Sequence, residues 1–472
     1  MLRKTKIVAT ISSMNCEPDF LKALYEAGMN VVRLNTAHIN HEEALLIVNN
    51  VRKVSDRIAI LLDTKGPEIR TCRAEKQLTV QHGDYVRFKG APDDVSKDDV
   101  ICVTHRDFVK DIPIKSTILI DDGSIALTVK EKDDEYLTCF VENPGVIIGR
   151  KSINIPSVHV TLPAISQKDE DFIRFAAEHD IDFIAHSFVR NKKDVLAVQK
   201  ILDETNSKVK IIAKIENKEG VDNIEEILGY AYGIMIARGD LAVEIPAQKI
   251  PLIQKQMIQK CMEKCKPVIV ATQMLHSMIN SPRPTRAEVS DIANACLDHT
   301  DALMLSGETA NGQYPLESVK TMAKIAKEVE EDKSTFYNVP YTKENKVTSY
   351  LAKAAVKASI RLNTKLIVAD TVTGKTIRSI ATYRGDNYVY VVSYNRRVTR
   401  ELALSYGINA HYFPMEEDSS VPIRKAILKM VNNGSLEVDD LITVLAGHFG
   451  IKQGASYIEI SKVGNMIEKR LQ

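Results

Sequence analysis

The amino-acid sequence predicts an α/β protein built on a closed (β/α)8 TIM barrel. The first observation is a repeated alternation of short strands with helices, three strands before residue 64 and five after residue 182. The second is that these strands are apolar throughout, as is typical of parallel strands covered on both faces. The third is that charged residues follow the strands, where such barrels carry their active sites. An open doubly wound sheet is the alternative, because strand counts depend on pattern alone.

The expected elements of the barrel follow one another along the chain. Val- and Ile-rich runs predict strands at residues 7–11, 31–34, 58–63, 183–188, 209–213, 233–237, 268–272 and 302–305. Apolar residues three or four positions apart predict helices at residues 19–27, 42–54, 192–202, 220–230, 249–264, 285–297 and 315–329. We therefore assign residues 1–71 and 151–337 to the catalytic barrel.

Residues 72–150 interrupt the barrel with a different pattern. Short strands separated by Gly, Asp and Lys turns are expected at residues 78–81, 85–88, 118–120, 126–129 and 136–140. This pattern predicts a small inserted β domain. Such an insertion is either a lid that closes over the barrel mouth or a passive surface addition.

Residues 338–472 carry a second α/β pattern, with a helix at 347–362 and strands at 366–370, 388–393 and 441–446. The segment TVTGKT at 371–376 opens a helix with hydroxyl, amide and ammonium donors, which suit a phosphate group. Helix capping is the alternative. A glycine-rich segment at 447–454 is placed to close over the same site. We expect a phosphorylated small-molecule effector at Thr371, Thr373, Gly374, Lys375 and Thr376.

Composition limits the class of protein. In 472 residues, 63 Lys and Arg balance 62 Asp and Glu, which gives no general case for nucleic acid or a membrane surface as a partner. The seven cysteines are scattered, and no apolar run approaches the ~18 residues of a membrane helix. The N-terminus enters a strand without a signal peptide pattern, so we expect a cytoplasmic protein.

Two neighbouring strands end in charged residues. The first ends in KIEN at 214–217 and the second in RGD at 238–240, and the helix between them makes a right-handed crossover. Glu216 and Asp240 should therefore meet beside Lys214. Two carboxylates suit a hard cation such as Mg²⁺, and an ammonium group suits an anionic substrate. A charged loop patch without chemistry is the alternative reading of these residues.

Further motifs extend along the chain, and together they identify a resemblance. They are KIVATI at 6–11, RLN at 33–35, DTKGPEIRT at 63–71, ATQML at 271–275, PRPTRAEVSDIANA at 282–295 and MLSGETA at 304–310. The chain resembles the pyruvate kinase family over essentially its whole length. The resemblance implies a β-barrel lid, a C-terminal regulatory domain and a homotetramer. It also implies transfer of the phosphoryl group of phosphoenolpyruvate to ADP, giving pyruvate and ATP in glycolysis.

Site residues follow from the resemblance, motif by motif. The metal ligands for Mg²⁺ or Mn²⁺ would be Glu216 and Asp240. The catalytic residues would be Lys214, Thr272, Ser306 and Arg33. The substrate would be bound by Arg33, Lys214, Arg238, Gly239, Asp240 and Thr272. The nucleotide would be bound by Asn35, His38, Arg70 and Lys151.

One departure concerns the monovalent cation. The resemblance implies K⁺ at Asn35, Asp63 and the Thr64 carbonyl, together with a serine hydroxyl whose position is Ala37 here. Either a water molecule or the adjacent Thr36 would have to complete the shell, so K⁺ dependence stays open.

Two other functions remain as alternatives. A Mg²⁺-dependent pyruvate-enolate aldolase also needs two carboxylates and an enolate site, but it gives no reason for the inserted domain or Lys151. A catalytically dead metabolite sensor would keep the C-terminal loop only, and the intact Lys214, Glu216, Asp240 and Thr272 argue against it.

Overall fold

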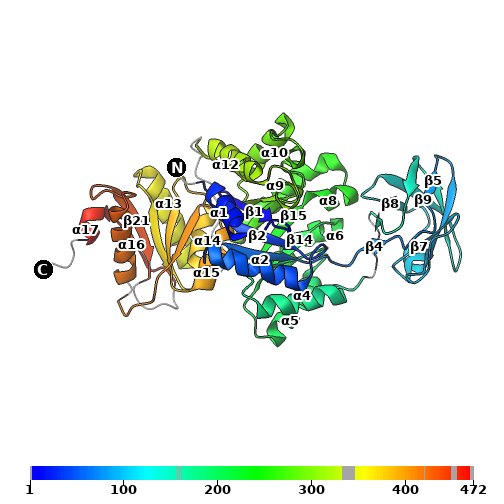
Figure 1. Cartoon of the computed structure of the whole chain (residues 1–472). Coiled ribbons are helices and arrows are strands. Elements are labelled where there is room, and N and C mark those ends of the chain that lie inside the picture. Colours follow the sequence, from blue (N-terminus) through cyan, green and yellow to red (C-terminus); the bar gives the residue numbers. More distant parts are fainter. Residues whose placement is uncertain are drawn as a thin grey trace.

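Eight parallel strands close into a barrel at the centre of the molecule (Figure 1). The computed structural model describes residues 3–156, 158, 160, 162–331, 346–418, 420–447 and 454–467. The strands are β1 (Lys6–Thr10), β2 (Val31–Asn35), β3 (Ala59–Asp63), β13 (Phe183–His186), β14 (Lys210–Ile215), β15 (Gly233–Ala237), β16 (Val268–Ala271) and β17 (Ala302–Leu305). Their order around the barrel is β1-β17-β16-β15-β14-β13-β3-β2, which confirms the predicted barrel and excludes an open sheet.

The barrel has an apolar interior and an outer layer of helices. Val8, Leu61, Phe183 and Met235 fill the interior, and Leu404 packs against them from the C-terminal part of the chain. The helices are α1 (Pro18–Ala27), α2 (His41–Val54), α4 (Gln167–Glu178), α5 (Lys192–Glu204), α6 (Lys218–Asp222), α7 (Ile224–Tyr230), α9 (Ile250–Glu263), α10 (Arg286–Leu297) and α12 (Pro315–Glu331). The sequence analysis missed α4 and expected one helix where α6 and α7 are separated by Asn223.

Three barrel strands end earlier than expected, β1 by one residue at Thr10 and two others at sharp turns. β13 stops at His186, and Phe188 adopts a left-handed backbone with φ of 55°. β16 stops at Ala271, and Thr272 and Gln273 have φ of 71° and 55°. The expected strands 183–188 and 268–272 were therefore too long, because the backbone turns sharply where it reaches the barrel mouth.

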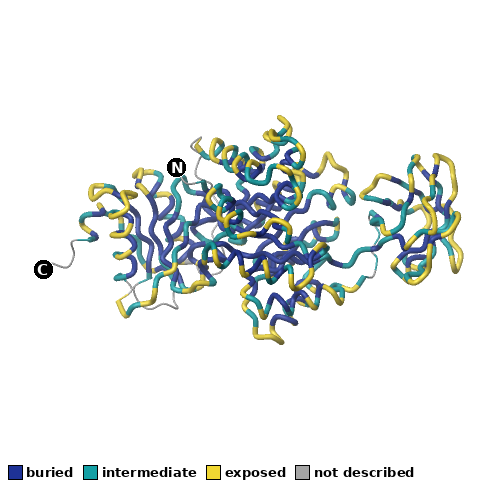
Figure 2. Tube along the Cα trace, in the orientation of Figure 1, coloured by how far each residue is buried: buried dark blue, intermediate teal, exposed yellow. Residues whose placement is uncertain are grey.

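The inserted segment forms a β unit beyond the barrel mouth. One sheet has the order β4 (Ile69–Arg70), β12 (Ser152–Asn154), β8 (Thr117–Ile120), β9 (Ile125–Lys132), β10 (Leu137–Val141), β6 (Tyr85–Gly90) and β7 (Val100–Val103). A bridge between Thr71 and Val103 brings its two edge strands together. β5 (Leu78–Val80) pairs with β11 (Gly145–Ile147), and α3 (Phe108–Asp111) packs against β6. Figure 2 shows that this unit has a buried interior of its own.

The C-terminal unit is a five-stranded sheet flanked by helices. Its strands are β20 (Ile408–Tyr412), β19 (Val389–Ser393), β18 (Ile367–Thr371), β21 (Leu441–Ala446) and β22 (Tyr457–Lys462), of which β22 runs antiparallel. Its helices are α13 (Lys346–Arg361), α14 (Lys375–Thr382), α15 (Arg396–Glu401), η3 (Leu402–Leu404), α16 (Ser420–Asn432) and α17 (Val463–Ile467). The sequence analysis did not predict β20 and β22. Most of the expected loop 447–454 lies outside the described residues.

Buried ion pairs join the barrel to the C-terminal unit. Arg384 contacts Asp301 at 2.8 Å, and Arg400 contacts Asp182 at 2.7 Å. The apolar core is also continuous across this boundary. Among the described helices, none is long and apolar enough to cross a membrane.

Candidate functional site

Lys214 lies at the centre of a polar cluster at the barrel mouth. It follows the apolar part of β14, so the strand delivers its side chain to the cluster. Its ammonium nitrogen lies 2.7 Å from Ser187 Oγ, 2.9 Å from Asp63 Oδ1 and 3.1 Å from Glu216 Oε1. Burial alone would lower the pKa of Lys214, but the carboxylates of Asp63 and Glu216 outweigh it and raise the pKa. Lys214 is therefore a fixed cation whose three N–H donors all have acceptors.

Asp63 joins Lys214 to a second cation, Arg33. Arg33 Nε donates to Asp63 Oδ2 at 2.6 Å, and Arg33 Nη1 donates to Thr10 Oγ1 at 2.9 Å. Burial would raise the pKa of Asp63, but Arg33 and Lys214 overcome it and hold the pKa below its ordinary value. Asp63 is thus an ionised carboxylate that fixes two cations at the mouth.

Glu216 and Asp240 are brought together as the crossover predicts. Burial raises the pKa of Glu216 to about 7; Lys214 opposes this rise, whereas Asp240 adds to it. Glu216 Oε2 also accepts the Phe188 amide at 2.7 Å. A buried and a half-buried carboxylate that repel each other suit a hard divalent cation, which would compete with the proton.

The metal would need ligands from outside the protein. Within the described part of the chain, no group of three or more His, Cys, Asp and Glu side chains could hold a metal ion. Mg²⁺ commonly takes one or two carboxylates and completes its shell with water and substrate oxygens. The donor set at Glu216 and Asp240 fits that pattern.

Thr272 contacts the start of α8 (Arg238–Glu244) in a strained conformation. Its Oγ1 accepts the Gly239 amide at 2.8 Å and donates to the Ala271 carbonyl at 2.6 Å. A φ of 71° is unfavourable for a β-branched residue, so the surrounding contacts must hold it in place. Such strain is common at functional sites.

Arg238 points into the protein. Its guanidinium contacts Asp291 at 2.7 Å and donates to the Thr272 carbonyl at 2.8 Å. Arg238 therefore stabilises the turn at Thr272 through its carbonyl oxygen. Arg238 is one of the six residues predicted to bind substrate. Unlike the others, its charge is paired with a carboxylate outside the Lys214 cluster, that of Asp291.

Ser306 lies at the end of β17, and its amide donates to Glu308 Oε2 at 2.7 Å. The other oxygen of Glu308 accepts the Leu275 amide at 3.1 Å. Glu308 is 2% exposed, so it ties the loop after β16 to the loop after β17. The sequence analysis did not assign this positioning contact.

The predicted K⁺ ligands lie side by side, since Asn35 and Asp63 are paired in register between β2 and β3. Thr36 is buried, and its hydroxyl donates to the Asp63 carbonyl at 2.9 Å. The hydrogen of the Thr36 hydroxyl is therefore already used in this bond. The Thr64 carbonyl accepts the Ser187 hydroxyl at 2.6 Å.

The predicted nucleotide ligands lie at the rim and at the root of the inserted unit. His38 is exposed. Arg70 contacts Glu68 at 2.7 Å, and Lys151 contacts Asp121 at 3.0 Å. Both lie where the chain passes between the barrel and the inserted unit.

The turn between β8 and β9 faces the barrel mouth. Burial raises the pKa of Asp240, Lys214 opposes the rise, and Asp122 and Glu68 add to it. Asp122 belongs to the inserted unit, so this turn lies close enough to affect a barrel carboxylate. The inserted unit thus has the placement of a lid.

The predicted effector residues surround the start of α14. Gly374 has a φ of 77°, and its amide donates to Thr371 Oγ1 at 2.8 Å. Thr371 and Thr376 are buried, so these two hydroxyls are less accessible than expected. This bond closes a turn before α14, in which Gly374 is the N-cap residue and no side chain caps the first turn of the helix.

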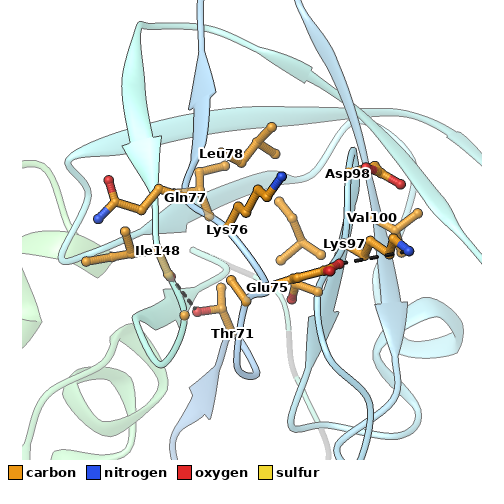
Figure 3. Close-up of a pocket in the computed structure, with 14 residues that line it drawn as sticks. Thr71, Glu75, Lys76, Gln77, Leu78, Lys97, Asp98, Val100 and Ile148 are labelled. Atoms are coloured by element: carbon orange, nitrogen blue, oxygen red, sulfur yellow. Dashed lines mark hydrogen bonds and ion pairs between the residues drawn. The ribbon is translucent and has the colours of Figure 1, made fainter.

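Two cavities lie away from the barrel mouth. One of about 290 Å³ lies at the root of the inserted unit, where Thr71 bonds to the Ile148 carbonyl and Glu75 contacts Lys97 at 3.9 Å (Figure 3). The other, of about 650 Å³, lies between α12 and the C-terminal sheet. Neither cavity is lined by Lys214, Glu216 or Asp240.

Sequence reasoning missed Ser187 and Phe188 as parts of the site. The segment was read as the end of a strand, which hid the turn that aims the Ser187 hydroxyl at Lys214 and the Phe188 amide at Glu216. The available signal was polar residues at the end of an apolar strand, the same signal that located Lys214.

Comparisons with known proteins agree with this architecture. The family model described as pyruvate kinase, barrel domain, matches residues 2–319, and the one described as pyruvate kinase, alpha/beta domain, matches residues 349–461. A pyruvate kinase of Borreliella burgdorferi is 46% identical over 99% of this chain and 98% of its own. One from Staphylococcus epidermidis is 42% identical over 99% of this chain and 82% of its own. The crystal structure of a pyruvate kinase from Cryptosporidium parvum matches with a TM-score of 0.91 and 36% identity, covering 98% of this chain and 96% of that chain.

Proposed function

This chain belongs to the pyruvate kinase family and is a phosphotransferase, and we propose how its barrel mouth transfers the phosphoryl group of phosphoenolpyruvate to ADP. The products are pyruvate and ATP. The observation that carries the proposal is the cluster in which Lys214 contacts both Asp63 and Glu216 at about hydrogen-bond distance. It places a fixed cation beside Glu216, one of the two carboxylates assigned to the divalent cation, and beside Asp63, which holds Lys214 and Arg33.

Lys214 and Arg33 supply the positive charge that phosphoryl transfer needs. Catalysis of this reaction depends mainly on positioning and on electrostatic stabilisation of the phosphoryl oxygens. Asp63 holds both cations through 2.6 Å and 2.9 Å contacts, so neither has to reorganise as charge develops. An oxygen of the substrate phosphoryl group would replace one of the three acceptors that now contact the Lys214 ammonium.

The family requires a divalent metal, and we assign its protein ligands to Glu216 and Asp240, with Mg²⁺ or Mn²⁺ as the ion. When bound, such an ion supplies Lewis-acid stabilisation of the enolate oxygen. We assign the substrate carboxylate to the Gly239 amide and the Thr272 hydroxyl, which would exchange their present bonds, to each other and to the Ala271 carbonyl, for bonds to the substrate. A bound ion would favour the ionised form of both carboxylates.

Pyruvate formation needs a proton at the methylene carbon of the enolate. Thr272 and Ser306 are the hydroxyl groups that we assign to this path, with water as the donor, because a hydroxyl is too weak an acid alone. The strained turn at Thr272 keeps its Oγ1 beside α8.

We assign the nucleotide to the rim formed by Asn35, His38, Arg70 and Lys151. Lys151 lies next to the inserted unit and is paired with Asp121, so movement of that unit would carry Lys151 with it. Closure would also exclude water from the reacting groups. We retain the boundaries 1–71 with 151–337, 72–150 and 338–472 for the three domains.

A monovalent cation site is proposed at Asn35, Asp63 and the Thr64 carbonyl, with K⁺ as the ion. Ala37 contributes no hydroxyl, and the Thr36 hydroxyl is already bonded to the Asp63 carbonyl. Because that bond uses only the hydroxyl hydrogen, the Thr36 oxygen keeps its lone pairs, and either this oxygen or a water molecule would complete the shell. A phosphorylated effector at 371–376 is a further proposal from the donors of that segment, and a homotetramer is one from the resemblance.

The proposed function is tested by following pyruvate and ATP formation from phosphoenolpyruvate and ADP. The reactions should contain Mg²⁺ or a chelator, and K⁺, Na⁺ or tetramethylammonium. The account predicts turnover that requires both ADP and Mg²⁺. Folded protein without turnover, with or without phosphorylated effectors, would favour the aldolase or the sensor, which the comparisons do not support.

A further inference from the structure

Ser187 occupies a position between the catalytic cation and a backbone carbonyl. Its hydroxyl donates to the Thr64 carbonyl at 2.6 Å and accepts from Lys214 Nζ at 2.7 Å. Ser187 is 2% exposed, so water does not compete for these bonds. A serine hydroxyl has one donor and two acceptor positions, so both bonds form at once.

Among the described residues, Ser187 is the one neutral partner of the Lys214 ammonium. The other two acceptors, Asp63 Oδ1 and Glu216 Oε1, are carboxylate oxygens at 2.9 Å and 3.1 Å. Those carboxylates also contact Arg33 and the Phe188 amide, so they are held from other directions. Ser187 therefore fixes the direction of the ammonium group without adding charge.

The backbone holds Ser187 firmly in this position. The Ser187 amide donates to Thr64 Oγ1 at 3.1 Å, so the side chain of Thr64 and its carbonyl both contact the same residue. Gly66 approaches so closely that a Cβ there would lie 2.7 Å from Ser187 Cβ, and its φ of 75° favours glycine. The loop after β3 and the turn after β13 thus form one packed unit.

We propose that Ser187 is a positioning residue that couples the Thr64 carbonyl to the Lys214 ammonium. The proposal rests on the proposed function, in which Thr64 is a K⁺ ligand and Lys214 acts on the phosphoryl group. A carbonyl oxygen has two lone pairs, so it can accept the Ser187 hydroxyl and contact a cation together. A change at Thr64 is then transmitted through one hydroxyl to the reacting end of Lys214.

The test compares wild type with Ser187→Ala and with Ser318→Ala. Ser318 is a matched control, because it is also fully buried and its hydroxyl donates to a backbone carbonyl, that of Tyr314, at 2.8 Å. Ser318 lies in α12, away from the cluster. Each variant is assayed for kcat, for KM of phosphoenolpyruvate and for the K⁺ concentration that gives half-maximal rate.

We expect Ser187→Ala to lower kcat by about 10- to 100-fold, as is typical when a residue that orients a functional group is removed. The K⁺ concentration for half-maximal rate should rise several-fold, and Ser318→Ala should change neither quantity. A second readout does not use turnover. The thermal midpoint of wild type should be higher in K⁺ than in tetramethylammonium, and this difference should shrink in Ser187→Ala.

The proposal is overturned if Ser187→Ala keeps the wild-type kcat, or if its K⁺ dependence and its K⁺-induced thermal shift equal those of wild type. If Ser187→Ala does not fold, Ser187→Gly removes the same hydroxyl and is judged by the same criteria. An inactive wild type would instead count against the proposed function. A wild type that is active but whose rate does not depend on K⁺ would overturn the proposed coupling and leave the proposed function standing.

Discussion

The hydroxyl oxygen of Thr272 accepts the backbone amide of Gly239 at 2.8 Å, across the mouth between the ends of β16 and β15. This bond is made by a β-branched residue with a φ of 71°. Strain of this kind costs about 1 to 3 kcal/mol and persists only where neighbouring contacts enforce it. The bond thus places a reactive hydroxyl beside the first turn of α8.

Replacement of Thr272 tests that placement. We expect Thr272→Ala to lower kcat by at least about 100-fold, the typical contribution of a group in a proton-transfer path. Thr272→Ser keeps the hydroxyl and should stay within about tenfold of wild type. Steady-state pyruvate formation measures both variants, and similar kcat values for the alanine variant and wild type would exclude this role.

Replacement of Lys151 tests the proposed nucleotide-binding site. Lys151→Met should raise KM for ADP about tenfold or more, while the thermal midpoint stays near wild type because the Asp121 pair is partly exposed. Lys132→Met is the control, since Lys132 lies in the inserted unit and, among the described residues, bonds to the Lys110 and Ile112 carbonyls. Equal KM values for ADP in the two variants would contradict the assignment of Lys151.

The barrel and the C-terminal unit share a buried ion pair whose loss should be costly. Arg384 and Asp301 have side chains only 2% and 4% exposed. Arg384→Met leaves Asp301 buried without its cation, and we expect a loss of about 3 to 5 kcal/mol in the free energy of unfolding. Arg396→Met, which breaks the exposed pair with Asp56 across the same boundary, should cost under about 1 kcal/mol. Thermal and urea midpoints distinguish the two, and equal losses would contradict the argument.

Asp370 makes stability depend on pH. Burial raises its pKa from 3.8 to about 6, although a hydrogen bond from Tyr394 opposes the rise. Below pH 4 the carboxyl is protonated whether the protein is folded or unfolded, so it contributes nothing. Between pH 4 and 6 the unfolded state loses its proton first, so stability falls as pH rises.

Asp370→Asn removes this dependence. It should match wild type near pH 4 and be more stable by about 2 to 3 kcal/mol at pH 8, since one pKa unit is about 1.4 kcal/mol. Asp439→Asn is the opposite control, because the hydrogen bond with Lys462 lowers the pKa of Asp439. Relative to wild type it should be less stable by an amount that does not change between pH 4 and 8, because the contribution of Asp439 is lost only as the pH falls below 4 toward its lowered pKa. Thermal midpoints over this range measure both, and a pH-independent difference for Asp370→Asn would contradict the assignment.

The sequence was sufficient for the parts of the fold that repeat. Apolar runs such as 233–237 located the barrel strands, because parallel strands are buried on both faces. It was insufficient where few residues form an element, as for β12 (Ser152–Asn154), whose pairing with β4 and β8 is long-range. β20 was also missed, because Asn409 and Ala410 have low strand propensity, although its burial alternates as in a strand with one covered face.

The site residues also divide into those that local sequence patterns predict and those that depend on contacts distant in the sequence. Lys214 and Glu216 were found because they end a strong strand pattern, and their partner Asp240 follows from the crossover. The roles of Ser187 and Phe188 depend on a φ of 55° at Phe188, which no local propensity of an aromatic residue predicts. The direction of Arg238 could not be predicted either, because it depends on Asp291 in a different helix.

The central claim is that the Lys214 cluster transfers the phosphoryl group, and Lys214→Met tests it most directly. The variant keeps the length of the side chain and removes its charge. Rates of pyruvate and ATP formation from phosphoenolpyruvate and ADP should be compared at saturating Mg²⁺, with the fold checked by circular dichroism. The account predicts a fall in kcat of at least about 1,000-fold, or about 4 kcal/mol of transition-state stabilisation. A folded variant with kcat within tenfold of wild type would contradict the account.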